Sequence, residues 1–224
     1  MPIDANPLLS VRGVAVRFGG IVALDGVSFD VRRGDVCGLI GPNGAGKTTL
    51  FNCLSRLYPT QAGEIVFEGR SINHTPAHRI AGLGMGRTFQ NLAMFKTMSV
   101  RENVMVGAHC RSRCGFVSSA LRLPRVSAEE AQLRERASAI IDHLGLAPYA
   151  HRPVGDLPFG IQKRVEFARA LAAEPKLLLL DEPAAGLNHE ELSALSTLIR
   201  DARDRLGITV LLVEHHMSMV MGLS

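Results

Sequence analysis

The sequence predicts an α/β fold that is interrupted by a helical insertion. Short, continuous apolar runs at 36–40, 177–180 and 208–213 are typical of strands buried in a parallel sheet. Stretches with helical spacing follow the first two of these runs, at 47–57 and near 189–206. Between 91 and 156 the strand patterns fade, so this part of the chain is expected to be mainly helical.

The N-terminal elements have the pattern of half-buried strands. Residues 11–16 and 27–31 alternate apolar residues with small or polar ones, which places one face of each strand on a core. A further short strand is expected at 64–69, where Gly69 closes it.

The insertion has one strongly periodic helix, expected over 128–146. Charged residues separate its apolar positions, and Gly145 supplies a stop signal at its end. The apolar positions are Ala131, Leu133, Ala137, Ile140, Ile141 and Leu144.

Composition excludes some classes of protein. With 224 residues, 46% hydrophobic and 21% charged, the chain is expected to fold. No apolar run approaches the roughly 20 residues that cross a bilayer, and the N-terminus lacks the pattern of a secretory signal. A membrane role is therefore expected only through a partner. The net charge of +4 is compatible with phosphate ligands, anionic membranes or nucleic acid, and does not choose between them.

Residues 41–48 read "GPNGAGKT" and match the phosphate-binding P-loop pattern G-x-x-x-x-G-K-[ST]. An apolar strand before the motif and a helix after it supply the context that the pattern requires. Glycines let backbone N–H groups approach phosphate oxygens, lysine reaches the β- and γ-phosphates, and the threonine hydroxyl ligates Mg²⁺. The predicted nucleotide-binding residues here are Gly41, Pro42, Asn43, Gly44, Ala45, Gly46, Lys47, Thr48 and Thr49.

Two acidic residues end the apolar run at 177–180. Asp181 lies at the carboxyl end of the predicted strand, where open α/β sheets bind ligands, and is expected to hold Mg²⁺. Glu182 follows it and is expected to orient or deprotonate the attacking water. Together with the P-loop, these residues predict nucleotide hydrolysis.

The ordered motifs resemble the ATP-binding subunits of ABC transporters, over essentially the whole chain. After the Walker A motif at 41–49 come "RTFQN" at 87–91, which looks like the Q-loop with Gln90, and "LPFGIQKR" at 157–164, in the position of the ABC signature. "LLLLDEP" at 177–183 resembles Walker B, "AGLN" at 185–188 the D-loop, and "VEHH" at 213–216 the switch region with His215.

The resemblance implies the fold, the ligands and further site residues. The fold would be a P-loop NTPase (RecA-like) core with an N-terminal antiparallel β subdomain and an inserted α-helical subdomain. ATP and Mg²⁺ would be the ligands, with Phe18 stacking on adenine and Gly160 contacting nucleotide. The implied catalytic residues are Glu182, His215, Gln90 and Lys47, and the implied metal ligands are Thr48, Gln90 and Asp181.

Within the family, the motifs look like the LivG type, which energises import of branched-chain amino acids and related amides. That resemblance implies a second ATPase subunit, LivF-like or identical, two membrane permeases and a periplasmic binding protein. It places the chain peripherally on the cytoplasmic face of the inner membrane, with residues 90–110 toward the permeases. An ABC ATPase for another substrate, or a non-transport ABC ATPase acting on nucleic acid or ribosomes, is the alternative.

Several residues depart from the family pattern. Pro158, Phe159 and Ile161 replace the serine, glycine and glutamine of "LSGGQ", so phosphate contact there is expected to depend on Gly160 and the N-terminus of the following helix. Asn188 stands where D-loops usually have aspartate, and the LivG type tolerates asparagine at this position. His216 is a second histidine whose effect is open.

The predicted division of the chain follows from the same resemblance. Residues 1–90 and 158–224 form the nucleotide-binding core with its β subdomain, and 91–157 form the helical subdomain. The family normally continues beyond the position of Ser224 with a further strand and helix, so we expect a shortened C-terminus.

Overall fold

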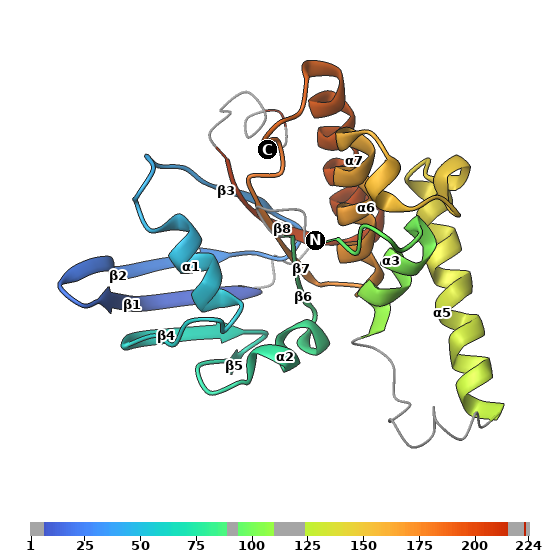
Figure 1. Ribbon diagram of the computed structural model, residues 1–224. Coiled ribbons are helices and arrows are strands. Elements are labelled where there is room, and N and C mark those ends of the chain that lie inside the picture. Colours follow the sequence, from blue (N-terminus) through green and yellow to red (C-terminus); the bar gives the residue numbers. More distant parts are fainter. Residues whose placement is uncertain (1–6, 89–93, 110–123, 215–221, 223–224) are drawn as a thin grey trace.

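A computed structural model describes residues 7–88, 94–109, 124–214 and 222 (Figure 1). It contains an antiparallel sheet, a parallel sheet and helices that cover them. In Figure 1 the antiparallel sheet and α1 lie on one side of the parallel sheet, and α3, α5, α6 and α7 lie on the other. The α/β prediction is confirmed.

The antiparallel sheet has the strand order β2-β1-β4-β5. Its strands are β1 (Leu9–Phe18), β2 (Ile21–Val31), β4 (Ala62–Phe67) and β5 (Arg70–Ser71). The strands predicted at 11–16 and 27–31 are the middle of β1 and the end of β2. Both are longer than predicted because β1 and β2 pair as a hairpin up to the Phe18–Ile21 turn.

The parallel sheet has the order β3-β8-β7-β6. It consists of β3 (Val36–Leu39), β6 (Met85–Arg87), β7 (Leu177–Asp181) and β8 (Thr209–Val213). Strands β7 and β8 are buried along their whole length, as their apolar runs predict. The prediction that the run at 36–40 is a fully buried strand is wrong, because β3 is an edge strand and is only partly buried.

The helices have bounds close to the predicted ones, although α1 is shorter. Ser99 and Asn188 form capping boxes that start α3 and α7, and Gly145 follows α5 with a φ of 64°. The helices are α1 (Lys47–Leu54), α2 (Ala77–Ile80), α3 (Val100–Ala108), α5 (Pro124–His143), α6 (Phe159–Ala172) and α7 (His189–Leu206). Short 3-10 turns occur at Ala81–Leu83, Ala147–Tyr149 and Val154–Asp156.

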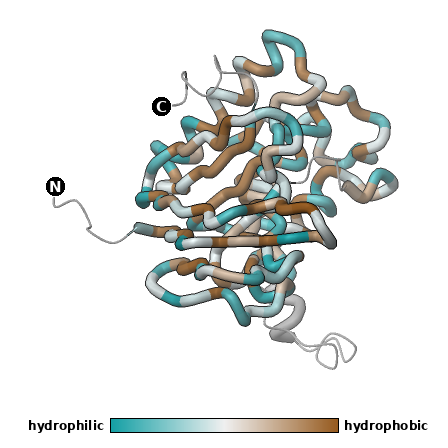
Figure 2. The backbone as a smooth tube through the Cα atoms, turned by 90° about the vertical axis from the view of Figure 1, so that its left-hand side faces the viewer, coloured by the Kyte–Doolittle hydropathy of each residue, from teal (hydrophilic) through white to brown (hydrophobic). Residues whose placement is uncertain are grey.

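The two central strands divide the hydrophobic core into two clusters. Leu177 and Leu179 of β7 belong to one cluster, with α1 and the antiparallel sheet, while Leu178 and Leu180 belong to the other, with α3, α5, α6 and α7. This split follows from the alternation of side chains along a strand. In Figure 2 hydrophobic segments run along the interior strands, and hydrophilic ones lie mainly at outer turns.

The segment predicted as a helical subdomain shares its core with the rest of the chain. Val100 and Val104 of α3 and Ile141 of α5 pack in the same cluster as Leu178 of the parallel sheet. The proposed boundaries at 90/91 and 157/158 stay a prediction. Among the described residues, none of the helices combines the length and apolarity that a bilayer crossing requires.

Helix α3 approaches α6 so closely that one position admits only glycine. A Cβ built on Gly107 lies 2.8 Å from the carbonyl carbon and from Cγ of Arg169, and it also overlaps the Arg169 carbonyl oxygen. The two helix backbones could not pack at this distance with a side chain between them.

We expect Gly107→Ala to lower the free energy of unfolding by about 1–3 kcal/mol, measured by urea denaturation. The clash with the backbone of α6 outweighs the roughly 1 kcal/mol that alanine gains over glycine within a helix. Gly82→Ala is the control, because no atom lies within 4 Å of its added Cβ. Equal unfolding energies for the two variants would contradict the close packing of α3 on α6.

Candidate nucleotide-binding site

The predicted P-loop forms a turn between β3 and α1. Gly44 and Gly46 have φ values of 83° and 84°, in the left-handed region that favours glycine. Gly46 is also the N-cap of α1, so the first N–H groups of this helix, which have no partner within it, lie at the turn. The loop therefore combines the backbone freedom and the helix terminus that bind phosphate.

Lys47 folds back over the loop. Its Nζ donates hydrogen bonds to the carbonyl oxygens of Gly41 at 2.6 Å and of Pro42 at 2.8 Å. The Ala45 N–H donates to the same Pro42 oxygen at 3.2 Å, which closes the turn. The ammonium group is thus held inside the curve of the loop, where it complements a phosphate.

A cavity of about 550 Å³ lies over this loop. It brings Glu182, from the end of β7, together with Lys47 and Thr48. Ile21 and Val22, at the start of β2, add exposed apolar surface. The full lining is Ile21, Val22, Ala23, Asn43, Gly44, Gly46, Lys47, Thr48, Thr49 and Glu182.

Phe18, predicted to stack on adenine, ends β1 next to this apolar surface. Its side chain is 48% exposed, and its ring meets that of Tyr58 edge-on, with the centroids 5.3 Å apart. Phe18 is outside the lining of the cavity, although Ile21 and Val22 of the same hairpin belong to it. Its contact with a base stays a prediction. Tyr58 was not among the predicted site residues.

Asp181 is buried at the end of β7, on the face of the sheet that α1 covers. It is 1% exposed, and its Oδ2 lies 3.1 Å from a guanidinium nitrogen of Arg87. Burial raises the pKa of the Asp181 carboxyl, and the charge of Arg87 opposes this shift. Oδ1 of Asp181 is buried without a hydrogen-bond partner in the part of the chain that the structure describes.

The residues around Asp181 fit a magnesium ion that phosphate helps to hold. The unpartnered Oδ1 supplies one oxygen acceptor, and Thr48 supplies a hydroxyl at the start of α1. Over the described ranges, no cluster of three His, Cys, Asp or Glu residues forms a complete protein cage. Mg²⁺ in nucleotide sites typically uses one or two protein oxygens together with phosphates and water.

Glu182 occupies a strained turn directly after β7. Its φ is 49°, which costs a non-glycine residue about 1–2 kcal/mol, and its N–H donates to the Val213 carbonyl at 3.0 Å. Glu214 is 2% exposed, and its Oε1 accepts the N–H of Ala184 at 2.8 Å. Glu214 thus links the end of β8 to the turn that carries Glu182. Glu214 was not among the predicted site residues, although an acidic residue directly after the apolar run at 208–213 is a signal.

The signature stretch, residues 157–164, starts helix α6. Gly160 is in its first turn, where backbone N–H groups lack partners within the helix. A Cβ on Gly160 would overlap the carboxyl group of Glu191 on α7. Gly160 does not line the cavity over the P-loop of its own chain.

The segment between β7 and α7 packs against the same helix. The Phe159 ring, 45% exposed, contacts Gly186, whose added Cβ would lie 2.9 Å from it. Asn188 caps α7, since its Oδ1 accepts the Glu191 N–H at 2.9 Å while Glu191 accepts the Asn188 N–H at 3.0 Å. Asparagine caps helices about as well as aspartate, which explains why Asn188 suffices here.

Two predicted site residues, Gln90 and His215, lie outside the described residues. Their roles stay predictions.

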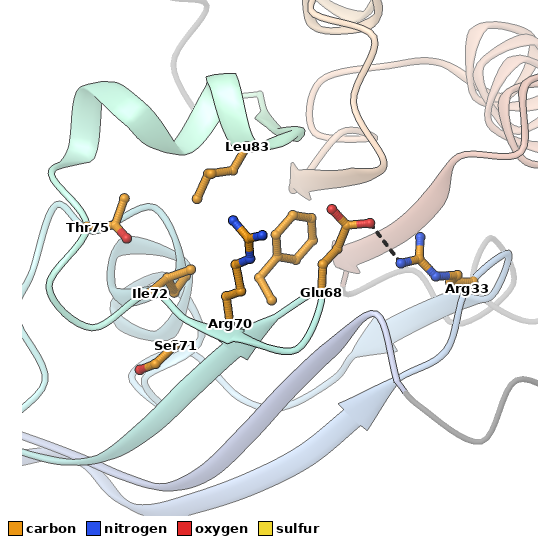
Figure 3. Close-up of a pocket in the computed structure, with 8 residues that line it drawn as sticks. Arg33, Glu68, Arg70, Ser71, Ile72, Thr75 and Leu83 are labelled. Atoms are coloured by element: carbon orange, nitrogen blue, oxygen red, sulfur yellow. Dashed lines mark hydrogen bonds and ion pairs between the residues drawn. The ribbon is translucent and has the colours of Figure 1, made fainter.

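A second cavity, of about 540 Å³, lies near the amino end of β3, whereas the P-loop follows its carboxyl end. Figure 3 shows Glu68 within it, facing Arg33, with Arg70 beside Glu68. Glu68 accepts hydrogen bonds from Lys176 at 2.6 Å and from Arg33 at 2.7 Å, and both hold its pKa below the ordinary value. These ion pairs join the turn after β4, which carries Glu68, to the loops that precede β3 and β7. The P-loop and Glu182 follow the carboxyl ends of β3 and β7, so this cavity is separate from the predicted site.

We expect Gly46→Ala to be much more damaging than Gly44→Ala. Both residues have positive φ, so alanine is strained at either position. Only at Gly46 would the new Cβ also overlap the Ala23 carbonyl oxygen and lie 2.9 Å from Leu24. Thermal denaturation should show a larger drop in Tm for Gly46→Ala, with the excess equivalent to about 1–3 kcal/mol. Equal drops would contradict the described packing of the loop against β2.

Known proteins with similar sequences are transport ATP-binding proteins. The chain is 41% identical over 220 residues to the high-affinity branched-chain amino acid transport ATP-binding protein LivG of Salmonella typhimurium, covering 98% of this chain and 86% of that protein. The same identity and coverage are found with BraF of Pseudomonas aeruginosa, which has the same description.

Solved structures and a family model agree with these relatives. The ADP conformation of MJ1267, an ATP-binding cassette of an ABC transporter, is 32% identical with a TM-score of 0.84, over 98% of this chain and 85% of that one. The family model described as ABC transporter matches residues 24–185, which include the P-loop, the signature stretch and Glu182. The chain belongs to the ABC transporter family.

Proposed function

We propose that this chain binds and hydrolyses ATP to energise an ABC importer of branched-chain amino acids or related amino acids and amides. The observation that carries the proposal is the cavity in which the P-loop, Lys47, Thr48 and Glu182 meet. The names of LivG and BraF, each 41% identical to this chain, support the substrate class. No relative named above is described as acting on nucleic acid or ribosomes, so that alternative is not proposed.

The P-loop binds the phosphates of ATP. N–H groups from Gly44 to Thr49 surround the β-phosphate at the start of α1, and Lys47 leaves its two carbonyl partners to contact the β- and γ-phosphates. The exposed apolar side chains of Phe18, Ile21 and Val22 cover the adenine.

Thr48, Asp181 and Gln90 are the residues that would hold Mg²⁺. When bound, it would neutralise charge on the β- and γ-phosphates. Arg87 favours the ionised form of Asp181 that this role requires, against the effect of burial.

Hydrolysis requires a base beside the γ-phosphate. Glu182 accepts a proton from the attacking water at its carboxylate, and its strained backbone is typical of residues at functional sites. His215 donates a hydrogen bond to the γ-phosphate, and Gln90 signals nucleotide state to the permeases, as the family resemblance implies.

A second ATPase subunit is proposed to complete the site. Gly160 lies outside the cavity of its own chain, which supports contact of its N–H with nucleotide bound to a partner. ATP between the subunits favours the closed pair, because it binds that state more tightly. Two permeases and a periplasmic binding protein would complete the importer, with this chain peripheral to the cytoplasmic face of the membrane.

We expect Glu182→Gln to reduce ATP hydrolysis by about 10²–10⁴-fold, measured as phosphate release by the assembled transporter. Glutamine preserves the shape of the side chain and removes its basicity, so ATP affinity should change less than about threefold. Hydrolysis at the wild-type rate would contradict the role of Glu182 as the base.

Lys47→Ala tests ATP binding rather than hydrolysis. Loss of a charge-assisted hydrogen bond to phosphate should weaken ATP binding by about 10–100-fold, measured with a fluorescent ATP analogue. Lys176→Ala is the matched control, since Lys176 pairs with Glu68 at the amino end of β7, away from the P-loop. Full ATP affinity in Lys47→Ala would reject the P-loop assignment.

The substrate class is tested by uptake in cells that lack this gene. Uptake of labelled leucine should fall, and wild-type protein should restore it while Glu182→Gln should not. Unchanged leucine uptake, with loss of uptake of an unrelated solute, would reject the proposed substrate class and leave the ATPase assignment intact.

A further inference from the structure

Arg87 joins three elements around the predicted metal ligand. It ends β6 and points to the face of the parallel sheet that α1 covers, where Met85 of the same strand also packs. One guanidinium nitrogen donates to Asn52 Oδ1 at 2.8 Å and to Ser55 Oγ at 3.1 Å, and the other donates to Asp181 Oδ2 at 3.1 Å.

The contacts of Arg87 are shielded from water. The Arg87 side chain is 9% exposed and that of Asp181 is 1% exposed, and the guanidinium lies 5.7 Å from the centre of the Phe51 ring. A charge at such a site is tolerated because its partner is present, and removing one partner leaves the other uncompensated.

The two carboxylate oxygens of Asp181 have different surroundings. Oδ2 is held by Arg87, whereas Oδ1 has no hydrogen-bond partner among the residues that the structure describes. A fixed carboxylate with one oxygen held and the other available is the arrangement found where an outer partner orients a metal-binding group.

We propose that Arg87 is the positioning residue for the divalent cation, holding Asp181 against α1, the helix that carries Thr48. The inference rests on the proposed function, since it concerns the metal at the same site. Through Asn52 and Ser55, Arg87 fixes Asp181 relative to the helix that begins with Lys47 and Thr48. The two predicted metal ligands on β7 and α1 thereby keep a constant separation.

The geometry requires arginine rather than lysine. The planar guanidinium reaches α1 with one nitrogen and β7 with the other, whereas a lysine ammonium is a single point of charge. A lysine at this position would retain the charge beside Asp181 and lose the simultaneous contact with α1.

The experiment measures ADP affinity with Mg²⁺ and with EDTA, and takes the ratio of the dissociation constant in EDTA to that in Mg²⁺. Loss of an outer partner of a metal ligand typically costs 10–100-fold in metal affinity, so Arg87→Ala should reduce this ratio by about tenfold or more. Its affinity in EDTA should stay within about twofold of wild type, because the P-loop binds phosphate without Asp181. Arg87→Lys should give an intermediate ratio.

Controls separate positioning from a general loss of structure. Arg12→Ala removes an arginine from an exposed ion pair with Asp30 and should leave the ratio unchanged. If Arg87→Ala fails to fold, as judged by thermal denaturation, the same ratio is measured with Arg87→Lys instead. In an Asp181→Asn background, Arg87→Ala should change the ratio less than twofold, because the residue acts through Asp181.

Two results would overturn the inference: equal weakening of ADP binding with and without Mg²⁺, or an undiminished effect of Arg87→Ala in the Asp181→Asn background. Either would leave Arg87 with a purely structural role and the proposed function standing. Absence of ADP binding by the wild-type protein under both conditions would instead overturn the proposed function.

Discussion

Strand β7 is buried on both faces along its whole length. Its alternate leucines serve two hydrophobic clusters, one with α1 and the antiparallel sheet and one with the remaining helices. Asp181, two residues after Leu179, must therefore share the α1 face of the sheet. The same alternation that fills the core thus places a carboxylate beside the helix of the P-loop.

The Asp181 carboxylate is buried, so its ionised form requires a compensating positive charge close to it. Burial disfavours the ionised form of Asp181, and Arg87 on β6 counters that effect. Because Arg87 also contacts α1, the ion pair connects strand, sheet edge and helix. The turn that carries Glu182 is supported separately, by backbone pairing with β8 and by Glu214.

Much of the fold and of the site could be predicted from local patterns. The P-loop, β7, β8 and α7 have strong periodicity or fixed spacing, and the structure assembles Lys47, Thr48 and Glu182 in one cavity. Strand β6 could not be predicted, because the three residues of "MGR" have no strand pattern and form a strand only by pairing with β7. Arg87 was missed for the same reason, since its partners are 32 to 94 residues away. The edge position of β3 is likewise a property of the sheet order.

The packing of Gly160 against Glu191, and of Phe159 against Gly186, has a mechanical consequence. The beginning of α6 contacts the segment from Gly186 to Glu191, and an added methyl group at Gly160 or Gly186 would overlap a side chain of the other segment. Replacing either glycine would therefore displace the side chain that it contacts on the other segment. A side chain at position 160 would disturb this contact within the chain, so loss of activity after substitution of Gly160 does not by itself identify a lost contact with nucleotide.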